Sequence, residues 1–400
     1  PAVRLFSSDP DVFDLSQSNL PAAMGTSRVS FCVPPIMTAT ATATEASSLN
    51  DFLALAQASG LRPLRLAGRE LIPVVQGGMG VGVSAGGLAG TVARAGGMGT
   101  ISSVDLRRLH QDLMEQTAHL TKIAGSKPVI DAANLEALDR EIRAARAIAA
   151  GQGIVAVNVM RALSEYEAYV KQALASGADA IVVGAGLPLD LPELAQDYPG
   201  VALIPILSDA RGVQLVVRKW MKKGRLPDAI VIEHPRLAGG HLGAARVTDL
   251  GDRRFDFEVA IPQVREFFAA EGIDIPLIAA GGISSHDDIV RLQALGAAAV
   301  QLGTAFAVTA ESNAAPEFKR VLAEATPEDM VEFVSVAGLP ARAVRTPWLD
   351  KYLRIEPKLK AVAHAKGLCN MAFDCLAHCG LRDGKSEMGQ FCIDKQLGHA

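Results

Sequence analysis

The chain has few aromatic residues, little net charge and few cysteines, and each scarcity excludes a class of protein. Aromatic residues make up 5% of the 400 residues, too few for the stacking platforms of single-stranded nucleic-acid binders. The formal net charge is −4, so no basic surface for nucleic acid or an anionic membrane is indicated. No uninterrupted apolar run reaches the roughly 18–20 residues that a membrane-spanning helix needs. The sequence therefore predicts neither a nucleic-acid nor a membrane partner.

Cysteine is scarce, and most of it lies near the carboxyl terminus. A secreted disulfide scaffold would be smaller and richer in cysteine, so a reducing, cytoplasmic location is expected. Thiolates gathered in one segment can bind zinc or an iron–sulfur cluster, although the spacing here lacks the tight Cys-x₂-Cys pair usual for structural zinc. Free thiols or a disulfide are the alternative, and His378 could substitute as a ligand. The candidate metal ligands are Cys369, Cys375, Cys379 and Cys392.

Composition divides the chain into three expected parts. Residues 1–60 contain a Thr-Ala alternation at 38–44 and predict a disordered, low-complexity extension, with a short helix at 49–58 leading out of it. Met37 within this part is a candidate natural start. Residues 61–350 are expected to form the main domain, and residues 351–400 a separate cysteine-containing segment.

The main domain alternates between apolar, β-branched runs and amphipathic segments, which is typical of a parallel sheet covered by helices. Eight strands in this length favour a (β/α)₈ TIM barrel. A doubly wound sheet is the alternative, but its glycine signals would concentrate after the first strand. The expected strands are 71–76, 98–102, 154–159, 179–183, 202–206, 228–232, 275–280 and 298–302, and the expected helices are 84–95, 136–150, 164–176, 209–222, 261–271 and 285–295.

Glycine follows several of these strands, at the positions that a barrel would gather on one rim. Backbone N–H groups in such loops, with a helix amino terminus, favour a phosphate after the seventh and eighth strands. A single glycine pair could merely make a tight turn, but five loops at one structural position favour a binding site. The loops contain Gly77 and Gly78, Gly184, Gly239 and Gly240, Gly281 and Gly282, and Gly303 followed by the hydroxyl of Thr304.

Two kinds of side chain could act beside such a phosphate. His241 follows Gly239 and Gly240, and an imidazole changes charge near neutral pH, so it could move a proton there. Asn158 and Gln76 end otherwise apolar strands and could either cap a loop or meet the polar edge of a heteroaromatic ring. His234 is interpreted as a rim histidine without a catalytic role.

The glycine loops, Asn158 and His241 together resemble the nitronate monooxygenase family, formerly called 2-nitropropane dioxygenase-like. This family also includes FMN-dependent enoyl-acyl-carrier-protein reductases and some NAD(P)H:quinone reductases. The resemblance covers about residues 70–345. The motifs that carry it, in chain order, are Gln76-Gly-Gly-Met79, Val157-Asn158-Val159, Ala238-Gly-Gly-His-Leu-Gly243, Ala279-Ala-Gly-Gly-Ile283, Gln301-Leu-Gly-Thr304, Glu311-Ser-Asn313 and Phe318-Lys319.

The resemblance implies a barrel that binds FMN. By position, Gly281, Gly282, Gly303 and Thr304 would hold its phosphate, with Gly239 and Gly240 close by. The residues that would line the isoalloxazine ring are Gln76, Gly77, Gly78, Met79 and Asn158. His241 matches the active-site histidine. Where many members have Gly-x-Glu-Ala before Gly-Gly-His, this chain has His234-Pro-Arg-Leu-Ala238, so the substrate side departs from the pattern.

The implied reaction is oxidation of an alkyl nitronate by O2 to a carbonyl compound and nitrite, with His241 binding the nitro oxygens or removing the α-proton. The alternative is an NAD(P)H-dependent reductase acting on an enoyl thioester or a quinone. In that case Ser208, Arg211 or Arg236 could meet a nucleotide phosphate, unless the arginines form surface salt bridges. A binding protein without catalysis is the third hypothesis. The family also suggests a homodimer.

Overall fold

The computed structural model describes residues 49–123, 125–241, 243–244, 246–334, 340–362 and 375–377. The expected extension before residue 49 lies outside this part, as do Cys369, Cys379, Cys392 and the side chain of His241. The chain divides into two units, Pro1–Ala46 and Ser47–Ala400, and all of the described helices and strands belong to the second. Helix α1, Leu49–Ala58, confirms the expected short helix.

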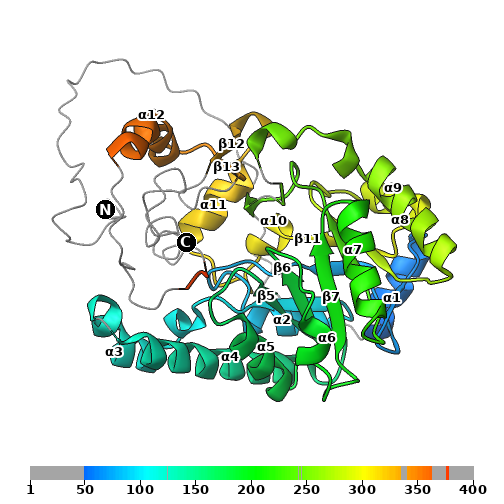
Figure 1. The fold of residues 1–400 in the computed structure, drawn as a ribbon, viewed down its shortest axis with the longest axis horizontal. Coiled ribbons are helices and arrows are strands. Elements are labelled where there is room, and N and C mark those ends of the chain that lie inside the picture. Colours follow the sequence, from blue (N-terminus) through cyan, green and yellow to red (C-terminus); the bar gives the residue numbers. More distant parts are fainter. Residues whose placement is uncertain are drawn as a thin grey trace, which may run out of the picture. The chain divides into compact units, whose positions relative to one another are not determined.

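Eight parallel strands close into a barrel (Figure 1), in the spatial order β10-β11-β3-β4-β5-β6-β7-β8. All eight predicted strands are present within a few residues of their expected bounds, so the barrel is confirmed and the doubly wound sheet is wrong. The strands are β3 Val74–Gln76, β4 Met98–Ser102, β5 Ile154–Met160, β6 Ala180–Gly184, β7 Ala202–Leu207, β8 Ile230–Glu233, β10 Leu277–Ala280 and β11 Ala299–Leu302.

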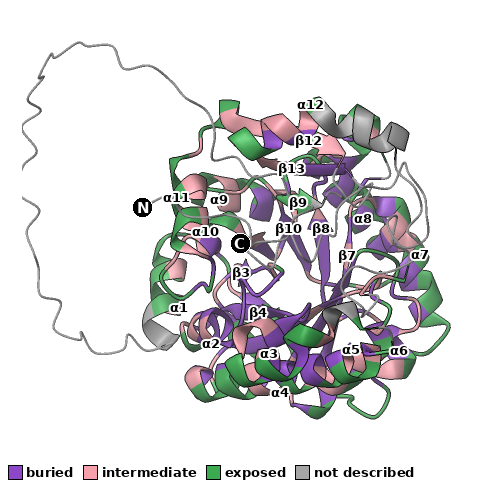
Figure 2. Ribbon diagram, turned by 90° about the vertical axis from the view of Figure 1, so that its left-hand side faces the viewer, coloured by how far each residue is buried: buried purple, intermediate pink, exposed green. Residues whose placement is uncertain are grey.

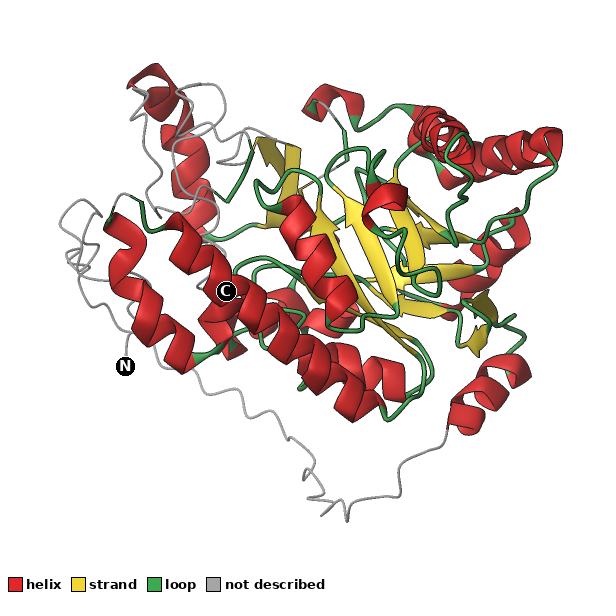
Figure 3. Ribbon diagram, turned by 60° about the horizontal axis from the view of Figure 1, so that its bottom comes forward, coloured by secondary structure: helices red, strands yellow, loops and turns green. Residues whose placement is uncertain are grey.

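Helices surround the strands (Figure 3) and confirm the predicted covering layer. They are α2 Gly86–Arg94, α4 Lys127–Ala149, α5 Tyr166–Ala175, α7 Ala210–Met221, α8 Phe257–Glu271 and α9 His286–Leu295, with the short α3 Gln111–Thr117 and α6 Leu191–Leu194 between them. Helix α4 begins earlier than expected, at Lys127. Pro128 stands in its first turn, where a missing N–H costs no hydrogen bond, so the amphipathic pattern extends back to this point.

Alternate residues of each strand point to opposite sides of the barrel wall, and both sides are buried (Figure 2). Ile154 and Ala156 of β5 belong to the inner core, whereas Val155 and Val157 pack outward against the helices. The same alternation on β8 places Val231 inside. The strands are therefore mainly apolar, and their polar side chains lie toward the carboxyl ends, as Thr100 and Ser102 do on β4 and Asn158 does on β5.

A small antiparallel hairpin closes the amino-terminal end of the barrel. Strands β1, Leu64–Leu66, and β2, Arg69–Leu71, pair with each other and send Leu64, Leu66 and Leu71 into the inner core. The sequence predicted one strand over 71–76, but the structure ends β2 at Leu71 and begins β3 at Val74. Pro73, which lacks an N–H for a ladder, lies in the break.

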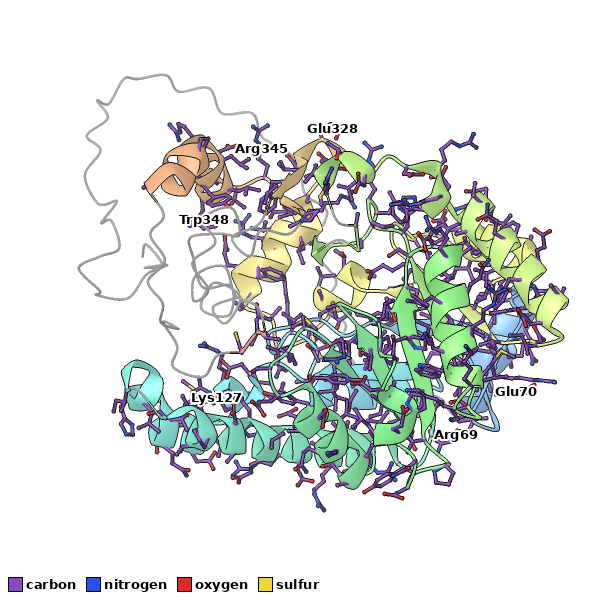
Figure 4. The ribbon with its side chains drawn as sticks, in the orientation of Figure 1. Arg69, Glu70, Lys127, Glu328, Arg345 and Trp348 are labelled. Atoms are coloured by element: carbon purple, nitrogen blue, oxygen red, sulfur yellow. The ribbon has the colours of Figure 1, made fainter. Side chains whose placement is uncertain are left out.

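A second sheet, which the sequence did not predict, lies beyond the barrel's last strand. After helices α10, Thr304–Ala307, and α11, Pro316–Glu324, the strands β12, Met330–Val334, and β13, Pro340–Val344, form a hairpin. The short strand β9, Gly240–His241, adds to its edge. Helix α12, Pro347–Val362, packs Leu349 and Tyr352 on the hairpin. Figure 4 places Arg345 and Trp348 at this end, away from Arg69 and Glu70 of the β1–β2 hairpin.

One short stretch of the C-terminal segment also contacts the barrel. Leu376 forms an isolated β-bridge with Leu163 in the loop after β5, and it packs against the outer core. The boundary at residue 350 remains a prediction, and α12 runs across it. No helix in the described ranges is long and apolar enough to cross a lipid bilayer.

Candidate active site

The carboxyl ends of the strands surround a mouth lined by the last inward-facing side chains. Three of these side chains are polar and large: Asn158 of β5, Glu233 of β8 and Gln301 of β11. Each continues the inward series of its strand, after Ala156, Val231 and Ala299 respectively. None of the three side chains has a hydrogen-bond partner among the residues that the structure describes. All three are partly exposed, so their polar atoms are accessible to a ligand, and the mouth is suited to a polar one.

The loops after β10 and β11 offer unpaired backbone donors. Gly281 and Gly282 have φ values of +106° and +69°, a region that favours glycine. No described residue accepts a hydrogen bond from the N–H of Gly281, Gly282 or Thr304. Adjacent N–H groups in such a loop form a concavity for an anion. The predicted phosphate-binding residues therefore do lie on two neighbouring loops with free donors.

Close packing explains several of the other predicted glycines. A β-carbon on Gly78 would lie 2.5 Å from Cβ of Asn158, and one on Gly77 would lie 3.0 Å from Nε2 of Gln301. A β-carbon on Gly303 would lie 3.7 Å from Sδ of Met79. The loop after β3 thus touches both β5 and the end of β11. The structure brings together the predicted Gly77, Gly78, Met79, Asn158 and Gly303, and adds Gln301.

Gln76 lies among these residues, but its side-chain amide forms hydrogen bonds within the protein. Its side chain is fully buried, accepts from the N–H of Thr100 at 2.9 Å and donates to the carbonyl of Thr100 at 3.0 Å. It also donates to the carbonyl of Gly77. Since both ends of the amide are occupied, Gln76 fixes β3 to β4 and orients the Gly77–Gly78 loop.

Gly184, at the end of β6, is buried on the far side of the mouth. A β-carbon there would lie 3.2 Å from Cδ1 of Ile206. Gly239 and Gly240 differ from the other predicted glycines because a β-carbon on either would meet nothing within 4 Å. Among the described residues, close packing therefore does not explain either glycine, and there is room for a ligand beside them.

Glu233 is a site residue that the sequence reasoning missed. It is the only charged residue at a last inward position of the described barrel strands, and it is partly exposed toward the mouth. Desolvation by the surrounding protein raises the pKa of its carboxyl to about 7. A β-carbon on Gly243 would lie 3.9 Å from its Oε2. The sequence does show a charged residue at the end of an apolar strand, but it does not show that Glu233 belongs to the inward series.

His234, the next residue, faces away from the mouth. Its ring stands edge-on to Phe257 at the start of α8, with 5.5 Å between ring centroids. Its Nε2 lies 3.6 Å from Oδ1 of Asp256, and burial lowers the pKa of the imidazole. Its interpretation as a histidine outside the reaction fits this location.

The backbone of His241 is held in the second sheet. His241 pairs with Ala341 of β13, and Gly240 pairs with Arg342. The hairpin also contacts the loop that precedes β9. Arg342 Nη1 donates a hydrogen bond to the carbonyl of Leu237 at 3.1 Å, and Arg236 forms an ion pair with Glu332 at 3.0 Å. Of the arginines weighed for a nucleotide phosphate, Arg236 is therefore in a surface salt bridge.

The cysteine prediction lies largely outside the described residues. Cys375 is the one candidate ligand inside them and is partly buried. No group of three or more His, Cys, Asp or Glu side chains in the described ranges could hold a metal ion. The metal site therefore stays a prediction.

Comparison with known proteins identifies the family. The family model described as nitronate monooxygenase matches residues 68–388. A probable nitronate monooxygenase of Bacillus subtilis is 34% identical over 127 residues, which cover 32% of this chain and 35% of that protein. A bicyclic carboxyl-CoA dehydrogenase of Mycobacterium tuberculosis is 28% identical over 279 residues, which cover 70% of this chain and 64% of that protein. The chain thus spans from about a third to less than two thirds of these relatives.

Solved structures share the fold. FabK from Thermotoga maritima is 22% identical with a TM-score of 0.53, and the match covers 86% of this chain and 93% of that one. The nitroalkane oxidase from Streptomyces ansochromogenes is 22% identical with a TM-score of 0.54, covering 85% and 95%. At this identity the likeness supports the barrel alone. Because the family model covers most of the sequence, the chain belongs to the nitronate monooxygenase family of FMN-dependent oxidoreductases.

Proposed function

We propose that this chain is an FMN-dependent nitronate monooxygenase, which oxidises alkyl nitronates with O2 to carbonyl compounds and nitrite. The observation that carries the proposal is the combination at the barrel mouth. Free backbone donors lie after β10 and β11, uncommitted polar side chains line the opening, and the backbone of His241 stands in the loop after β8. The probable nitronate monooxygenases among the relatives support this choice of reaction.

The residues present fit FMN. The N–H groups of Gly281, Gly282 and Thr304 would bind the phosphate, which backbone donors and the start of a helix both favour. The side chains of Asn158 and Gln301 would serve the polar edge of the ring, since an amide offers both a donor and an acceptor. Gly77 and Gly78 let the loop after β3 pack against Gln301 and Asn158, which would hold these two amides in place at the ring. FMN, when bound, supplies the electron transfer, and the chain supplies binding and orientation.

The chain's own groups would act on the substrate. His241 is proposed to bind the nitro oxygens of the nitronate, or to take the α-proton of a neutral nitroalkane, a step worth about 10²–10⁴-fold. Glu233 stands at the same opening and is proposed to remain protonated below about pH 7, so that it does not repel the anionic substrate. The inner core below the mouth is apolar and excludes water from beneath the site.

The experiment is turnover of propyl-1-nitronate and propionate-3-nitronate by the purified flavoprotein in air, with nitrite and oxygen measured together. The proposal expects nitrite release without any nicotinamide, and loss of about 10²-fold or more in His241→Gln. If the protein releases nitrite no faster than unbound FMN does in the same assay, the proposed reaction is contradicted.

A reductase is the second candidate, because one relative is named a carboxyl-CoA dehydrogenase and FabK shares the fold. That function would transfer a hydride between NAD(P)H, the flavin and an enoyl thioester or a quinone. Anaerobic bleaching of the 450 nm flavin band by NADH or NADPH, followed by reoxidation with crotonyl-CoA or a quinone, would support it. If the purified protein is colourless and does not bind added FMN, only the hypothesis of a binding protein without catalysis is left.

A further inference from the structure

The β12–β13 hairpin holds the loop that carries His241 at three points. Strand β9 pairs with β13 through Gly240 and His241. The guanidinium of Arg342 donates to the carbonyl of Leu237 at 3.1 Å. Arg236 forms an ion pair with Glu332 of β12 at 3.0 Å. A loop fixed both by strand pairing and by side chains has fewer ways to move than a loop fixed at its two ends.

Two of the three contacts involve residues that precede the Gly239–Gly240 pair, namely Arg236 and Leu237. The third involves Gly240 and His241 themselves. The hairpin therefore contacts this loop both before and after Gly239.

The same loop also rests on the loop after β10. A β-carbon on Gly282 would lie 2.9 Å from Cβ of Leu237, and one on Gly281 would lie 3.1 Å from the carbonyl oxygen of His234. Leu237 thus touches Gly282 through its side chain while Arg342 holds its carbonyl. A shift of the hairpin would be passed through Leu237 to both parts of the barrel mouth.

The hairpin is itself rigidly supported. Leu349 and Tyr352 of α12 pack against Val331 and Phe333, and the Tyr352 hydroxyl donates to the carbonyl of Val334 at 3.2 Å. At the end of β13, Arg345 pairs with Asp350 of α12 at 2.7 Å, so its side chain is engaged with the helix and not with the loop after β8. The Arg345–Asp350 pair is exposed and contributes little to stability, so Arg345 is a surface residue of the hairpin without a bond to the loop after β8, whereas Arg342 bonds to that loop.

We propose that Arg342 is a positioning residue that fixes the place of His241 by holding Leu237 and aligning β13 with β9. This proposal rests on the proposed catalytic role of His241. It concerns how the chain holds that residue, and it assigns Arg342 no contact with the substrate. The surface ion pair between Arg236 and Glu332 also holds this loop to the hairpin, although an exposed pair contributes little free energy.

The test compares Arg342→Met, Arg342→Lys and the matched control Arg345→Met in the full-length flavoprotein. We expect Arg342→Met to lower kcat for a nitronate, per bound flavin, by about tenfold, while KM changes less than about threefold, because misplacement of a reacting group affects mainly the chemical step. Lysine keeps one donor for the Leu237 carbonyl, so Arg342→Lys should recover most of kcat. Arg345→Met should have the same kcat and KM as the unsubstituted protein.

A second measurement separates this proposal from the proposed function. The ring resonances of ¹⁵N-histidine, with His241 assigned through His241→Gln, report the imidazole whether or not a nitronate is turned over. We expect the His241 signals to move in Arg342→Met, to return in Arg342→Lys and to stay in place in Arg345→Met. Unmoved His241 signals in Arg342→Met, or equal changes in Arg345→Met, would overturn the proposal. If the unsubstituted protein releases no nitrite but the His241 signals still move in Arg342→Met, only the proposed reaction is overturned.

Discussion

Gly78 lies directly against Asn158, so close that a β-carbon on Gly78 would stand 2.5 Å from Cβ of Asn158. Real β-carbons do not approach to this distance, so the loop after β3 reaches β5 only because residue 78 has no side chain. The contact joins two segments that are 80 residues apart in the chain, at an opening that is proposed to hold the FMN ring.

Gly78→Ala should therefore disturb the proposed ring site. The new methyl group must push either the loop or Asn158 away, and we expect the Kd of the FMN-free protein for FMN to rise about tenfold, which corresponds to about 1.4 kcal/mol. Quenching of flavin fluorescence measures this Kd. Gly200→Ala is the control, since a β-carbon there meets nothing within 4 Å. Equal FMN affinity in both variants would show that the contact does not shape the site.

Glu233 should make the stability of the FMN-free protein fall as pH rises. Its pKa is raised from 4.5 to about 7 on folding, so between these values the folded chain holds a proton that the unfolded chain has released. The contribution is therefore lost as pH rises, on the order of 2 kcal/mol by pH 8 after allowing for partial exposure. Urea unfolding at pH 5 and pH 8 measures it. Glu233→Gln should remove this part of the pH dependence, and the exposed Glu167→Gln should not.

The same carboxyl should control turnover of an anionic substrate. Above about pH 7 Glu233 is ionised and repels a nitronate at the mouth, so kcat/KM for the nitronate should decline there. In Glu233→Gln the decline should be absent, because the amide carries no charge. The measurement is kcat/KM between pH 6 and pH 9 with preformed nitronate. An unchanged decline in the glutamine variant would assign it to another group.

Two histidines seven residues apart in the chain should behave differently. His241→Gln should lose nitrite release by about 10²-fold or more, whereas His234→Gln should stay within about threefold. His234 packs on Phe257 outside the mouth, and its pKa is lowered by burial, so its replacement should instead reduce stability by about 1 kcal/mol. Because protonation of His234 is disfavoured in the folded state, the difference in stability should shrink at pH values below 6. Steady-state rates and thermal unfolding of both variants measure these effects.

Most of the barrel could be predicted from the sequence, because a strand buried on both faces leaves a continuous apolar run such as Ile154–Val157. The glycine loops could be placed on one rim because every parallel strand ends there. Asn158 and the glycines could be proposed as site residues because they recur at the ends of several strands, which a barrel gathers on one rim. What these signals could not give was the register of each strand.

Register explains the residues that were missed. Glu233 and Gln301 reach the mouth because they occupy the same inward series as Val231 and Ala299, which the sequence alone does not distinguish from the outward series. Gln76 ends a strand too, but its amide bonds to Thr100, and no local pattern indicates such a partner. The β9–β13 pairing was missed because it joins segments about 100 residues apart, and β9 has only two residues. The local β12–β13 hairpin was not predicted either.

The contact of the C-terminal segment with the barrel gives a last prediction. The carbonyl of Cys375 accepts from the N–H of Ser164 at 3.1 Å, and the N–H of Ala377 donates to the carbonyl of Ala162 at 2.9 Å. Leu376 between them packs against the outer core. Leu376→Ser should therefore cost about 1–2 kcal/mol of local stability, since it removes apolar contact that holds both hydrogen bonds in place.

Amide hydrogen exchange checks this, because the cost should appear in one loop. The N–H of Ser164 should exchange at least about tenfold faster in Leu376→Ser, which corresponds to the loss of about 1.4 kcal/mol of protection. Strand β6, Ala180–Gly184, should keep its exchange rates, as no residue of the segment bonds to it in the described ranges. Leu187→Ser, at an exposed leucine in the loop after β6, is the control and should leave the exchange of Ser164 unchanged. If the Ser164 amide exchanges at the same rate in Leu376→Ser and in the unsubstituted protein, the contact does not stabilise the loop after β5.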